Sequence, residues 1–590
     1  MVSRSVSYNY HKSKLNIICT TGLGIILLFL FTQCKNKEGL PDADRGNGGL
    51  SLPEGFGAVV VADSIGRARH LAVNSNGDIY VKLRVTDSVG GSIALRDTDG
   101  DGKADIIKKF GDYTDEGGYG TAMRIHNGYL YFSTSGIVYR NKLTPGKLIP
   151  EGKSEAILID DYENDIHGHE HIAKPVTFDN EGHMYVPFGS PGDACQELKR
   201  VPGSKGLNPC PELSEHGGVW QFDANKAGQT QKEGKLYATG LRSIVAFDWN
   251  KTENTLYALQ HGRDNLVGTW PELYTAYESA VLPAEEFFRV KEGTNGGWPY
   301  YYYDQIQKKK LLNPEYGGDG KIAAKGAEYE QPLIGFPGHW APNDLLFYTG
   351  NQFPERYKNG AFIAFHGSTI RAPYPQGGYF VAFVPFKNGV PSGDWEVFAD
   401  GFAGVDTIIS TSDAVARPMG LAMGPDGSLY VTESVKGKIW RIMYKGDKQG
   451  FGAAQLAQME KQKNLQPNIK TPDEIADNLE QGKTVAGATI YNTYCAACHQ
   501  YNGKGDGNRF PPLAGSEWVT GDKQKLIQIV LNGLNEPITV QDVPYNGLMP
   551  AHKFLKDEQV AAVVNYIRKH FNAMPDSIKA EEITVVRKSL

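Results

Sequence analysis

Near the C-terminus, the sequence Cys495-Ala-Ala-Cys498-His499 has the residue types and spacing needed for covalent attachment of haem. In a C-x-x-C-H motif the two thiols form thioethers with the haem vinyl groups, and the histidine binds the iron. A thioredoxin-like redox pair would need a βαβ context and no histidine, and a zinc site would need further ligands at suitable spacing. The motif therefore predicts a c-type haem held by Cys495 and Cys498, with His499 as one axial iron ligand.

The surroundings of this motif predict the second iron ligand. A helix containing Tyr491 precedes the motif and a predicted final helix contains Tyr566, an arrangement that resembles the class I cytochromes c. The resemblance implies an axial methionine on the loop before the last helix, and Met549 lies there. Met574 is the alternative, but it follows the last helix. Histidine and methionine ligation raises the reduction potential of a haem and suits electron transfer.

A second pattern, six copies of a turn followed by a strand, occupies residues 50–446. Each copy has Gly or Asn at the turn and an aromatic or apolar residue three positions later. Successive copies are 51 to 106 residues apart, which leaves room for a four-stranded blade of ~40–50 residues plus loop insertions. The pattern predicts an all-β six-bladed propeller, because a pair of β-sandwich sheets gives no reason for one repeated signature. The six pairs are Gly77 and Tyr80, Gly128 and Tyr131, Gly182 and Tyr185, Asn254 and Tyr257, Gly360 and Ile363, and Gly427 and Tyr430.

The length and composition indicate an ordered protein with more than one folding unit. The chain has 590 residues, of which 40% are hydrophobic and 22% charged, close to the globular average. The net charge of -6 leaves no basic excess to neutralise phosphates, which argues against a nucleic-acid partner.

After the repeats the chain changes character. Residues 447–475 are polar and rich in Gln and Lys, and we interpret them as a partly helical linker. Residues 476–575 are predicted to form the small all-α cytochrome c domain that follows the propeller. The last residues are expected to form a loose tail.

The N-terminus resembles a bacterial lipoprotein signal peptide over residues 1–34. An apolar run at 15–31 follows several basic residues and ends shortly before Cys34. Cys34 would then carry the lipid, although Gln33 is larger than the residue usual at that position. An uncleaved anchor or simple cleavage nearby is the alternative. The protein is thus expected to be exported and lipid-anchored to a membrane of the bacterial cell envelope, in the periplasm or at the outer membrane.

Several long stretches of the repeat region resemble the L-sorbosone dehydrogenase group of pyrroloquinoline-quinone (PQQ) sugar dehydrogenases, which are related to soluble quinoprotein glucose dehydrogenase. The resemblance implies PQQ and calcium as cofactors and a sugar, aldose or sorbosone-like substrate. With the haem motif it also implies electron transfer from PQQ to haem c and then to an external acceptor, a redox protein or a quinone. The stretches are HIAKPVTFDNEGHMYVPFGS, ATGLRSIVAFDW, QHGRDNL, NGGWPYYYYD, HWAPNDLLFYTG, AFHGS and ARPMGLAMGPDG.

Two residues of these stretches are implied to be catalytic. His171 corresponds to the family's base, which takes the hydroxyl proton of the substrate while hydride leaves. Arg242 corresponds to the arginine beside the quinone oxygens, where its charge stabilises the developing anion. Ser243 stands where the family commonly has asparagine. The alternative for His171 is membership of a solvated histidine cluster in the same loop.

The same resemblance implies binding residues for PQQ and calcium. PQQ carries three carboxylates, and Lys174, His366, Arg371 and Arg417 are the candidates to bind it. Surface ion pairs are the alternative for the cationic ones. Calcium would bind the backbone carbonyls at Gly262-Arg263, since calcium prefers oxygen ligands.

The acidic stretch DTDGDGKAD suggests another calcium site independently. Asp97, Asp99, Asp101 and Asp105 occupy ligand positions of an EF-hand-type loop, but Lys108 replaces the final glutamate. A complete EF-hand is therefore excluded, and a truncated structural calcium loop or a solvated acidic hairpin remains.

Cys195 and Cys210 are the two cysteines without another assignment. In an exported chain a disulfide between them is the simplest interpretation, and two free thiols are the alternative.

Together these features predict a quinohaemoprotein dehydrogenase. A binding protein whose propeller has lost PQQ, with the cytochrome as an electron relay, is a second hypothesis. A calcium-dependent lactonase is a third, but it leaves the haem motif without a purpose.

Overall fold

The computed structural model describes residues 39–590 except 114–119, 161–169, 327, 369, 372–373, 406–407, 409, 466–486, 508–509 and 576. The predicted signal peptide, with Cys34, lies outside the described residues, as does much of the predicted linker. Within the described part of the chain, no helix combines the length and apolar character needed to span a membrane.

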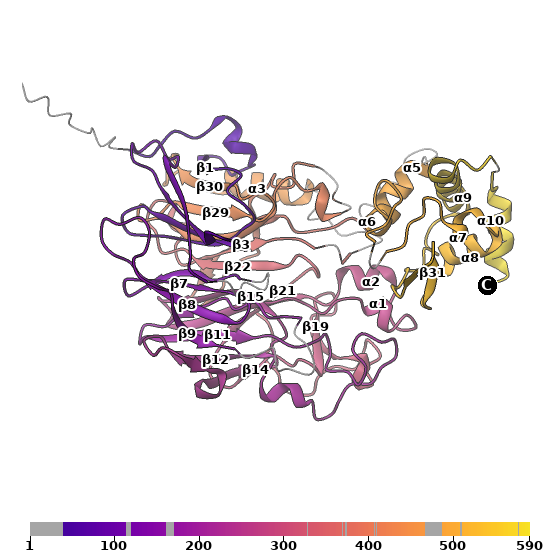
Figure 1. The fold of residues 1–590 in the computed structure, drawn as a ribbon, viewed down its shortest axis with the longest axis horizontal. Coiled ribbons are helices and arrows are strands. Elements are labelled where there is room, and N and C mark those ends of the chain that lie inside the picture. The colour runs from indigo at the N-terminus through magenta and orange to yellow at the C-terminus, as the bar shows by residue number, and fades with distance from the viewer. Residues whose placement is uncertain are drawn as a thin grey trace, which may run out of the picture. The chain divides into compact units, whose positions relative to one another are not determined.

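Six sheets of four or five strands are the blades of a β-propeller, so this predicted fold is confirmed (Figure 1). The first blade contains β2 (Ala68–Val73), β3 (Ile79–Asp87), β4 (Gly90–Arg96) and β5 (Ile106–Phe110). The second contains β6 (Met123–His126), β7 (Tyr129–Ser133), β8 (Ile137–Lys142), β9 (Glu155–Ile159) and β13 (Gln229–Thr230). The third contains β10 (Thr177–Phe178), β11 (His183–Phe188), β12 (Gly218–Asp223), β14 (Lys235–Thr239) and β18 (Thr294–Asn295).

The last three blades complete the ring. The fourth contains β15 (Ile244–Asn250), β16 (Thr255–Gln260), β17 (Glu285–Val290) and β21 (Ile334–Phe336). The fifth contains β22 (Pro342–Phe347), β23 (Ala361–Phe365), β24 (Phe380–Val384) and β27 (Glu396–Ala399). The sixth contains β28 (Pro418–Met423), β29 (Leu429–Glu433), β30 (Ile439–Tyr444) and β1 (Phe56–Ala62). Because β1 pairs antiparallel with β30, strands from both ends of the propeller share one sheet and lock the ring.

The repeated turn and strand signature is the second strand of every blade. The turn residue precedes β3, β7, β11, β16, β23 and β29 in turn. The residue three positions later is 0% to 5% exposed in all six copies. Strand side chains alternate between faces, so a fixed offset from the turn places this residue in the same inter-blade layer each time.

Three polar side chains, from β6, β15 and β22, and a backbone N–H of β28 meet near the propeller axis. Arg124 on β6 pairs through Nη2 with Asp344 Oδ1 on β22 at 2.6 Å, and Asp344 Oδ2 accepts the backbone N–H of Leu421 on β28 at 2.7 Å. Asp248 on β15 accepts the backbone N–H of Phe347 at 2.9 Å. These bonds join blades that are distant in sequence, which favours one register for the ring.

Asp248 predicts a pH-dependent stability. Burial raises its pKa to about 6, with the charge of Asp344 acting in the same direction. Because this pKa is above the unfolded value, the free energy of unfolding falls as pH rises from about 4 to about 6. Asp248→Asn should remove that dependence and add roughly 1–3 kcal/mol at pH 7, measured by urea denaturation at several pH values. The exposed Asp394→Asn is the control, and equal stability of both variants at pH 7 would contradict the prediction.

Insertions between β16 and β22 carry two short helices and a hairpin. These elements are α1 (Leu266–Thr269), α2 (Ala276–Val281), β19 (Tyr301–Asp304) and β20 (Lys309–Leu312). In α2 the Thr275 side chain and Glu278 form a reciprocal capping box, which explains where that helix begins. A second short hairpin pairs β25 (Phe386–Lys387) with β26 (Val390–Pro391).

The C-terminal part is helical. It contains α5 (Gly487–Ile490), a π-helical turn (Tyr491–Cys495), α6 (Ala496–His499), α7 (Glu517–Thr520), α8 (Lys523–Asn532) and α9 (Asp557–Tyr566). The rings of Tyr491 and Tyr566 lie 5.4 Å apart, so the segment before the haem motif packs against α9. The domain also contains a small hairpin of β31 (Ile538–Val540) and β32 (Val543–Tyr545), so it is not purely α-helical. Before this domain, α3 (Ala453–Leu465) lies in the predicted linker.

The predicted loose tail is wrong. Residues Ala580–Lys588 form helix α10, whose Ile583 and Val586 are buried. The two residues are three positions apart and therefore share one helix face. The Glu582 side chain accepts the Lys579 backbone N–H at 2.8 Å, which defines the start of the helix.

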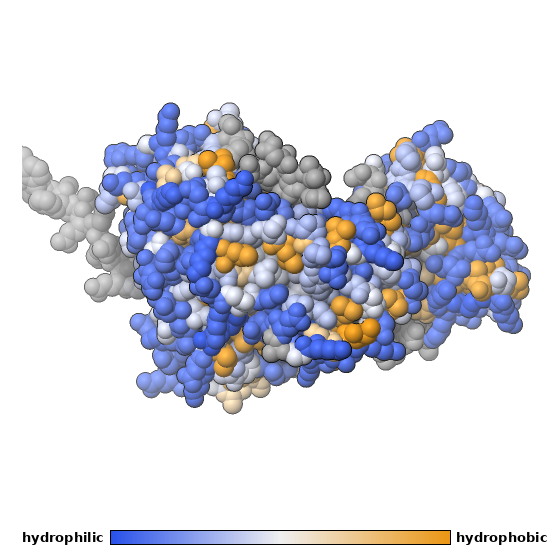
Figure 2. Space-filling view, turned by 90° about the horizontal axis from the view of Figure 1, so that it is seen from below, coloured by the Kyte–Doolittle hydropathy of each residue, from blue (hydrophilic) through white to orange (hydrophobic). Residues whose placement is uncertain are grey.

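The surface seen in Figure 2 is mainly hydrophilic, with apolar residues in small separated groups. This distribution is normal for a water-facing globular surface.

Candidate functional sites: a haem pocket and a polar site in the propeller

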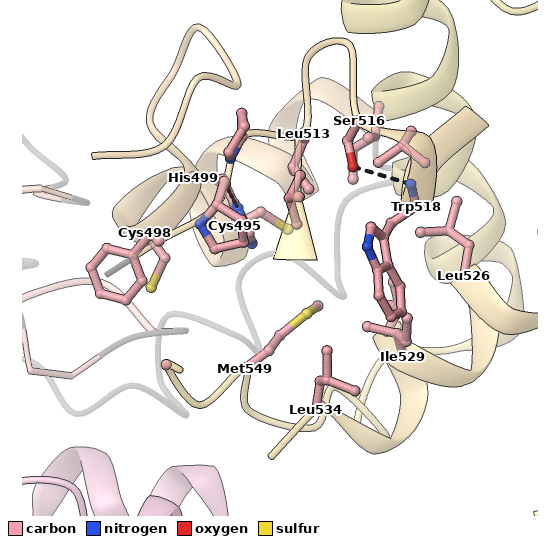
Figure 3. Close-up of a pocket in the computed structure, with 18 of the residues that line it drawn as sticks. Cys495, Cys498, His499, Leu513, Ser516, Trp518, Leu526, Ile529, Leu534 and Met549 are labelled. Atoms are coloured by element: carbon pink, nitrogen blue, oxygen red, sulfur yellow. Dashed lines mark hydrogen bonds between the residues drawn. The ribbon is translucent and has the colours of Figure 1, made fainter. Parts of the chain in front are cut away.

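The C-terminal domain contains a largely apolar pocket lined by the Cys495-x-x-Cys498-His499 motif (Figure 3). His499 Nδ1 lies 2.9 Å from the Pro511 carbonyl oxygen. Because a carbonyl only accepts, Nδ1 carries the proton and Nε2 has the lone pair that a metal ion needs. Burial lowers the pKa of His499, which also favours the neutral ligand form.

Met549 lies on another wall of this cavity, and its thioether sulfur points into the pocket in Figure 3. Two backbone hydrogen bonds of 2.9 Å, one in each direction, join Met549 to Leu534. A side chain at Gly533 would lie 2.3 Å from the Met549 carbonyl oxygen, so this approach requires glycine. Met574 is not among the residues that line the cavity. The geometry therefore favours Met549 as the second ligand.

The residues present fit a c-type haem. Two thiols, an imidazole and a thioether are the only donors the attachment and ligation need, and both cysteines are free of disulfides. Apolar side chains suited to the porphyrin faces complete the wall, namely Leu513, Leu526, Ile529, Val530 and Leu534. Ser516 Oγ accepts the Trp518 backbone N–H at 3.2 Å and so begins α7 beside the pocket.

The propeller contains a second polar site, around His171. His171 Nδ1 lies 2.7 Å from the Ser190 carbonyl oxygen, so Nδ1 donates and Nε2 is unprotonated. Burial and the charge of Arg242 together lower the pKa of His171 to about 3, although the charge of Asp193 opposes the shift. A Cβ at Gly189 would lie 2.2 Å from the His171 carbonyl oxygen, so only glycine permits this contact. His171 is therefore a neutral imidazole in a defined tautomer.

Arg242 is part of a buried ion-pair network beside His171. Its Nη2 lies 2.5 Å from Asp193 Oδ1, and Asp193 Oδ2 lies 3.1 Å from Arg200 Nη2. Burial of Asp193 opposes ionisation, but these two guanidinium groups lower its pKa. Asp264 belongs to the same electrostatic network, because its charge acts on His171 and on Asp193. The structure thus brings His171 and Arg242 together.

Sequence reasoning missed Asp193, Arg200 and Asp264. Asp264 is inside the stretch QHGRDNL, and Asp193 follows the glycine-containing SPG turn after β11. These local signals exist, but only the fold places the three residues beside His171.

The backbone carbonyl expected to bind calcium faces Arg242. Arg242 Nη1 donates to the Gly262 carbonyl oxygen at 2.9 Å and to that of His261 at 3.2 Å. The Arg263 side chain is buried and pairs with Glu315. The carbonyl of Gly262 therefore faces the site and accepts a hydrogen bond from Arg242 in this structure.

Arg417 and His366 form a compact hydrogen-bonded group with one cation, because burial and the charge of Arg417 lower the pKa of His366 well below its usual value. Arg417 Nη2 donates to His366 Nδ1 at 2.9 Å, which leaves the proton on Nε2 to donate to Ser434 Oγ at 2.6 Å. The other hydrogen-bond partners of the Arg417 guanidinium among the described residues are the carbonyls of His366 and Gly367, not carboxylates. Burial and the charges of nearby arginines lower the pKa of Arg417. This cation is suited to an anionic ligand.

The other two predicted PQQ contacts differ from Arg417. Lys174 is buried and its Nζ lies 2.6 Å from Asp160 Oδ2, so its charge is already balanced inside the blade. Arg371 is buried and acts electrostatically on Tyr379, whose ring also lies 5.6 Å from the Arg417 guanidinium.

The acidic loop between β4 and β5 brings together Asp97, Asp99 and Asp105, whose carboxylate oxygens lie within 4.8 Å of one another. Asp101 is not in this group. Asp97 accepts the Gly102 backbone N–H at 2.8 Å and Asp105 accepts Thr98 Oγ1 at 2.6 Å. These carboxylates thus accept hydrogen bonds from groups within the loop itself.

Cys195 and Cys210 form a disulfide with an S–S distance of 2.04 Å. It packs against Trp298, whose Nε1 donates to the Asp193 carbonyl oxygen at 2.8 Å. The cross-link therefore closes a loop next to the His171 site.

Comparison with known families agrees with this geometry. Residues 125–370 match the Glucose / Sorbosone dehydrogenase family, 311–445 match the TrAA12-like family and 484–571 match the Cytochrome c family. The structure of the PQQ domain of pyranose dehydrogenase from Coprinopsis cinerea has a TM-score of 0.50 and 17% identity, covering 69% of this chain and 98% of that one. At this identity the likeness shows the fold.

Two curated relatives match the C-terminal domain. Cytochrome c-552 of Thermus thermophilus is 47% identical over 85 residues, 14% of this chain and 64% of its own length. The cytochrome c subunit of a quinone alcohol dehydrogenase from Gluconobacter oxydans is 38% identical over 109 residues, 18% of this chain and 23% of its own length. The chain thus spans less than two thirds of either relative. It has a propeller that matches the Glucose / Sorbosone dehydrogenase family over residues 125–370, followed by a C-terminal cytochrome c domain.

Proposed function

We propose that this protein oxidises a sugar, aldose or sorbosone-like substrate with PQQ and passes the electrons through haem c to an external acceptor. The observation that carries the proposal is a neutral His171 with a free Nε2 next to the Arg242–Asp193 pair. His171 as a base and Arg242 as a fixed cation lie in a propeller that matches a dehydrogenase family. The same chain also has a haem pocket, which would receive the electrons.

The residues of the site have separate roles in this proposal. His171 Nε2 takes the hydroxyl proton of the substrate, while the hydrogen on the same carbon leaves with two electrons. Arg242 holds a positive charge where negative charge develops, and Asp193 keeps its guanidinium oriented. PQQ, when bound, would supply the two-electron acceptor that the amino acids lack.

Binding of the anionic cofactor is assigned to the cationic residues. Arg417, with His366 and Arg371, would face its carboxylates, and the carbonyls of Gly262 and Arg263 would hold calcium. Lys174 is the weakest member of this set because of its ion pair with Asp160.

The proposed electron path ends outside the protein. Ligation by His499 and Met549 suits one-electron transfer to a redox protein or a quinone. Export and lipid anchoring through Cys34 are part of the proposal. Mass spectrometry of the mature N-terminus would test them.

The function is tested by rapid mixing of protein, reconstituted with PQQ and calcium, with a panel of aldoses and sorbosone. We expect the haem to be reduced only when PQQ and a substrate are both present. Failure of PQQ to bind would contradict the proposal and favour a binding protein with a cytochrome relay. PQQ binding without haem reduction by any sugar would contradict the substrate class.

A further inference from the structure

A buried carboxylate, Glu315, joins two loops that border the His171 site. It lies in a short 3₁₀ turn (Pro314–Tyr316) after β20, and its side chain is 0% exposed. Oε2 accepts Arg263 Nη1 at 2.6 Å. Oε1 accepts Trp270 Nε1 at 2.8 Å and Gln196 Nε2 at 3.3 Å. Both carboxylate oxygens thus accept hydrogen bonds from side chains in different parts of the chain.

The bond to Arg263 supports the carbonyl loop. Arg263 directly follows Gly262, whose carbonyl oxygen accepts Arg242 Nη1 and whose N–H donates to Glu285 Oε2 at 3.1 Å. Glu315 thus holds the guanidinium of the residue that follows Gly262, next to a carbonyl that faces the site.

The bond to Gln196 supports the loop closed by the disulfide. Gln196 Oε1 accepts the Arg200 backbone N–H at 3.1 Å, and Arg200 Nη2 reaches Glu170 Oε2 at 2.7 Å as well as Asp193. Glu170 immediately precedes His171. The backbone N–H of Gly206, in the same loop, donates to the Glu315 carbonyl oxygen at 2.9 Å. A continuous set of hydrogen bonds thus runs from Glu315 to the segment that carries His171.

We propose that Glu315 is a positioning residue that holds the Gly262 carbonyl loop and the Cys195–Cys210 loop in the arrangement needed to bind PQQ with calcium. Glu315 touches neither cofactor nor substrate in this proposal, and it acts through Arg263 and Gln196. The ion pair between Arg263 and Glu315 is suited to this role, because both partners are buried and loss of either one leaves a buried charge.

The test compares PQQ binding by wild type and Glu315→Gln, measured in calcium by the quenching of tryptophan fluorescence. The amide has the shape of the carboxylate, but it cannot accept on both sides. We expect the apparent dissociation constant for PQQ to rise at least tenfold, with an unchanged haem spectrum. Glu396→Gln is the matched control, since it disrupts the two-bond pair with Arg356 on another blade.

The outcomes distinguish positioning from simple stability. A lower melting temperature with wild-type PQQ affinity in Glu315→Gln would overturn the inference, because that is the signature of a purely structural residue. If Glu315→Gln does not fold, Gln196→Leu and Trp270→Phe each remove one bond to Glu315. Both should then raise the dissociation constant at least threefold, and wild-type affinity in both would overturn the inference.

The inference rests on the proposed function, but different experimental results would contradict the proposed function and the positioning role. Wild-type protein that takes up no PQQ contradicts the proposed function. Wild-type protein that binds PQQ, together with a Glu315→Gln variant that binds it equally well, contradicts the positioning role alone.

Discussion

Replacing His171 with asparagine should slow substrate-dependent reduction of the haem by roughly 10²–10⁴-fold, the range expected for loss of a general base. The asparagine amide can still donate to the Ser190 carbonyl oxygen, as His171 Nδ1 does at 2.7 Å. It has no basic nitrogen at the position of Nε2, so the substrate proton has no acceptor. The measurement is rapid-mixing spectroscopy of the haem after reconstitution with PQQ and calcium.

The control for this variant is His183→Asn. His183 lies on β11 and is hydrogen-bonded to Asp179 at 2.7 Å, and its loss should leave the rate near that of wild type. PQQ binding and the haem spectrum should be unchanged in His171→Asn. Sugar oxidation at the wild-type rate in His171→Asn would show that another group is the base.

Replacing Met549 with leucine should lower the haem reduction potential by on the order of 100 mV and remove the sulfur-to-iron charge-transfer absorption of the oxidised protein. Leucine has nearly the same volume, so the apolar wall beside Leu534 should remain packed, but it cannot bind iron. A potentiometric titration followed by absorbance gives the potential. Haem should remain covalently attached, because Cys495 and Cys498 are unaffected.

Met574→Leu is the matched control for this assignment. Met574 follows the final turn after α9 and does not line the haem pocket. Its replacement should leave the potential unchanged. If the reduction potential shifts in Met574→Leu and stays at the wild-type value in Met549→Leu, then Met574 and not Met549 is the second iron ligand.

The haem site and the architecture were largely predictable because their signals are local or periodic. The attachment motif is five contiguous residues, so no knowledge of folding is needed to place Cys495, Cys498 and His499 together. The propeller signature repeats because each blade needs the same tight turn and the same buried residue after it. Helix α10 was missed since its buried face comprises only Ile583 and Val586, too short a pattern to separate from a tail.

The polar site was predictable only in part. Resemblance placed His171 and Arg242, but their charged neighbours come from positions far apart in the chain. Asp193 is 49 residues from Arg242, and Gln196 is 119 residues from Glu315. Whether a lysine or arginine is free for a ligand depends on such partners. Lys174 is paired with Asp160, whereas Arg417 has no carboxylate partner among the described residues.

By itself the sequence was enough to predict the haem attachment motif and the number of blades, because a contiguous motif and a repeated strand pattern can each be recognised within a few residues. Only the tertiary structure decided which charged and polar side chains form ion pairs and hydrogen bonds with one another. It placed the free nitrogen of His171 beside Arg242 and Asp193, and it joined Glu315 to both neighbouring loops. The physical reason is that ion pairs and hydrogen bonds act over about 3 Å in space, a range that sequence separation does not report.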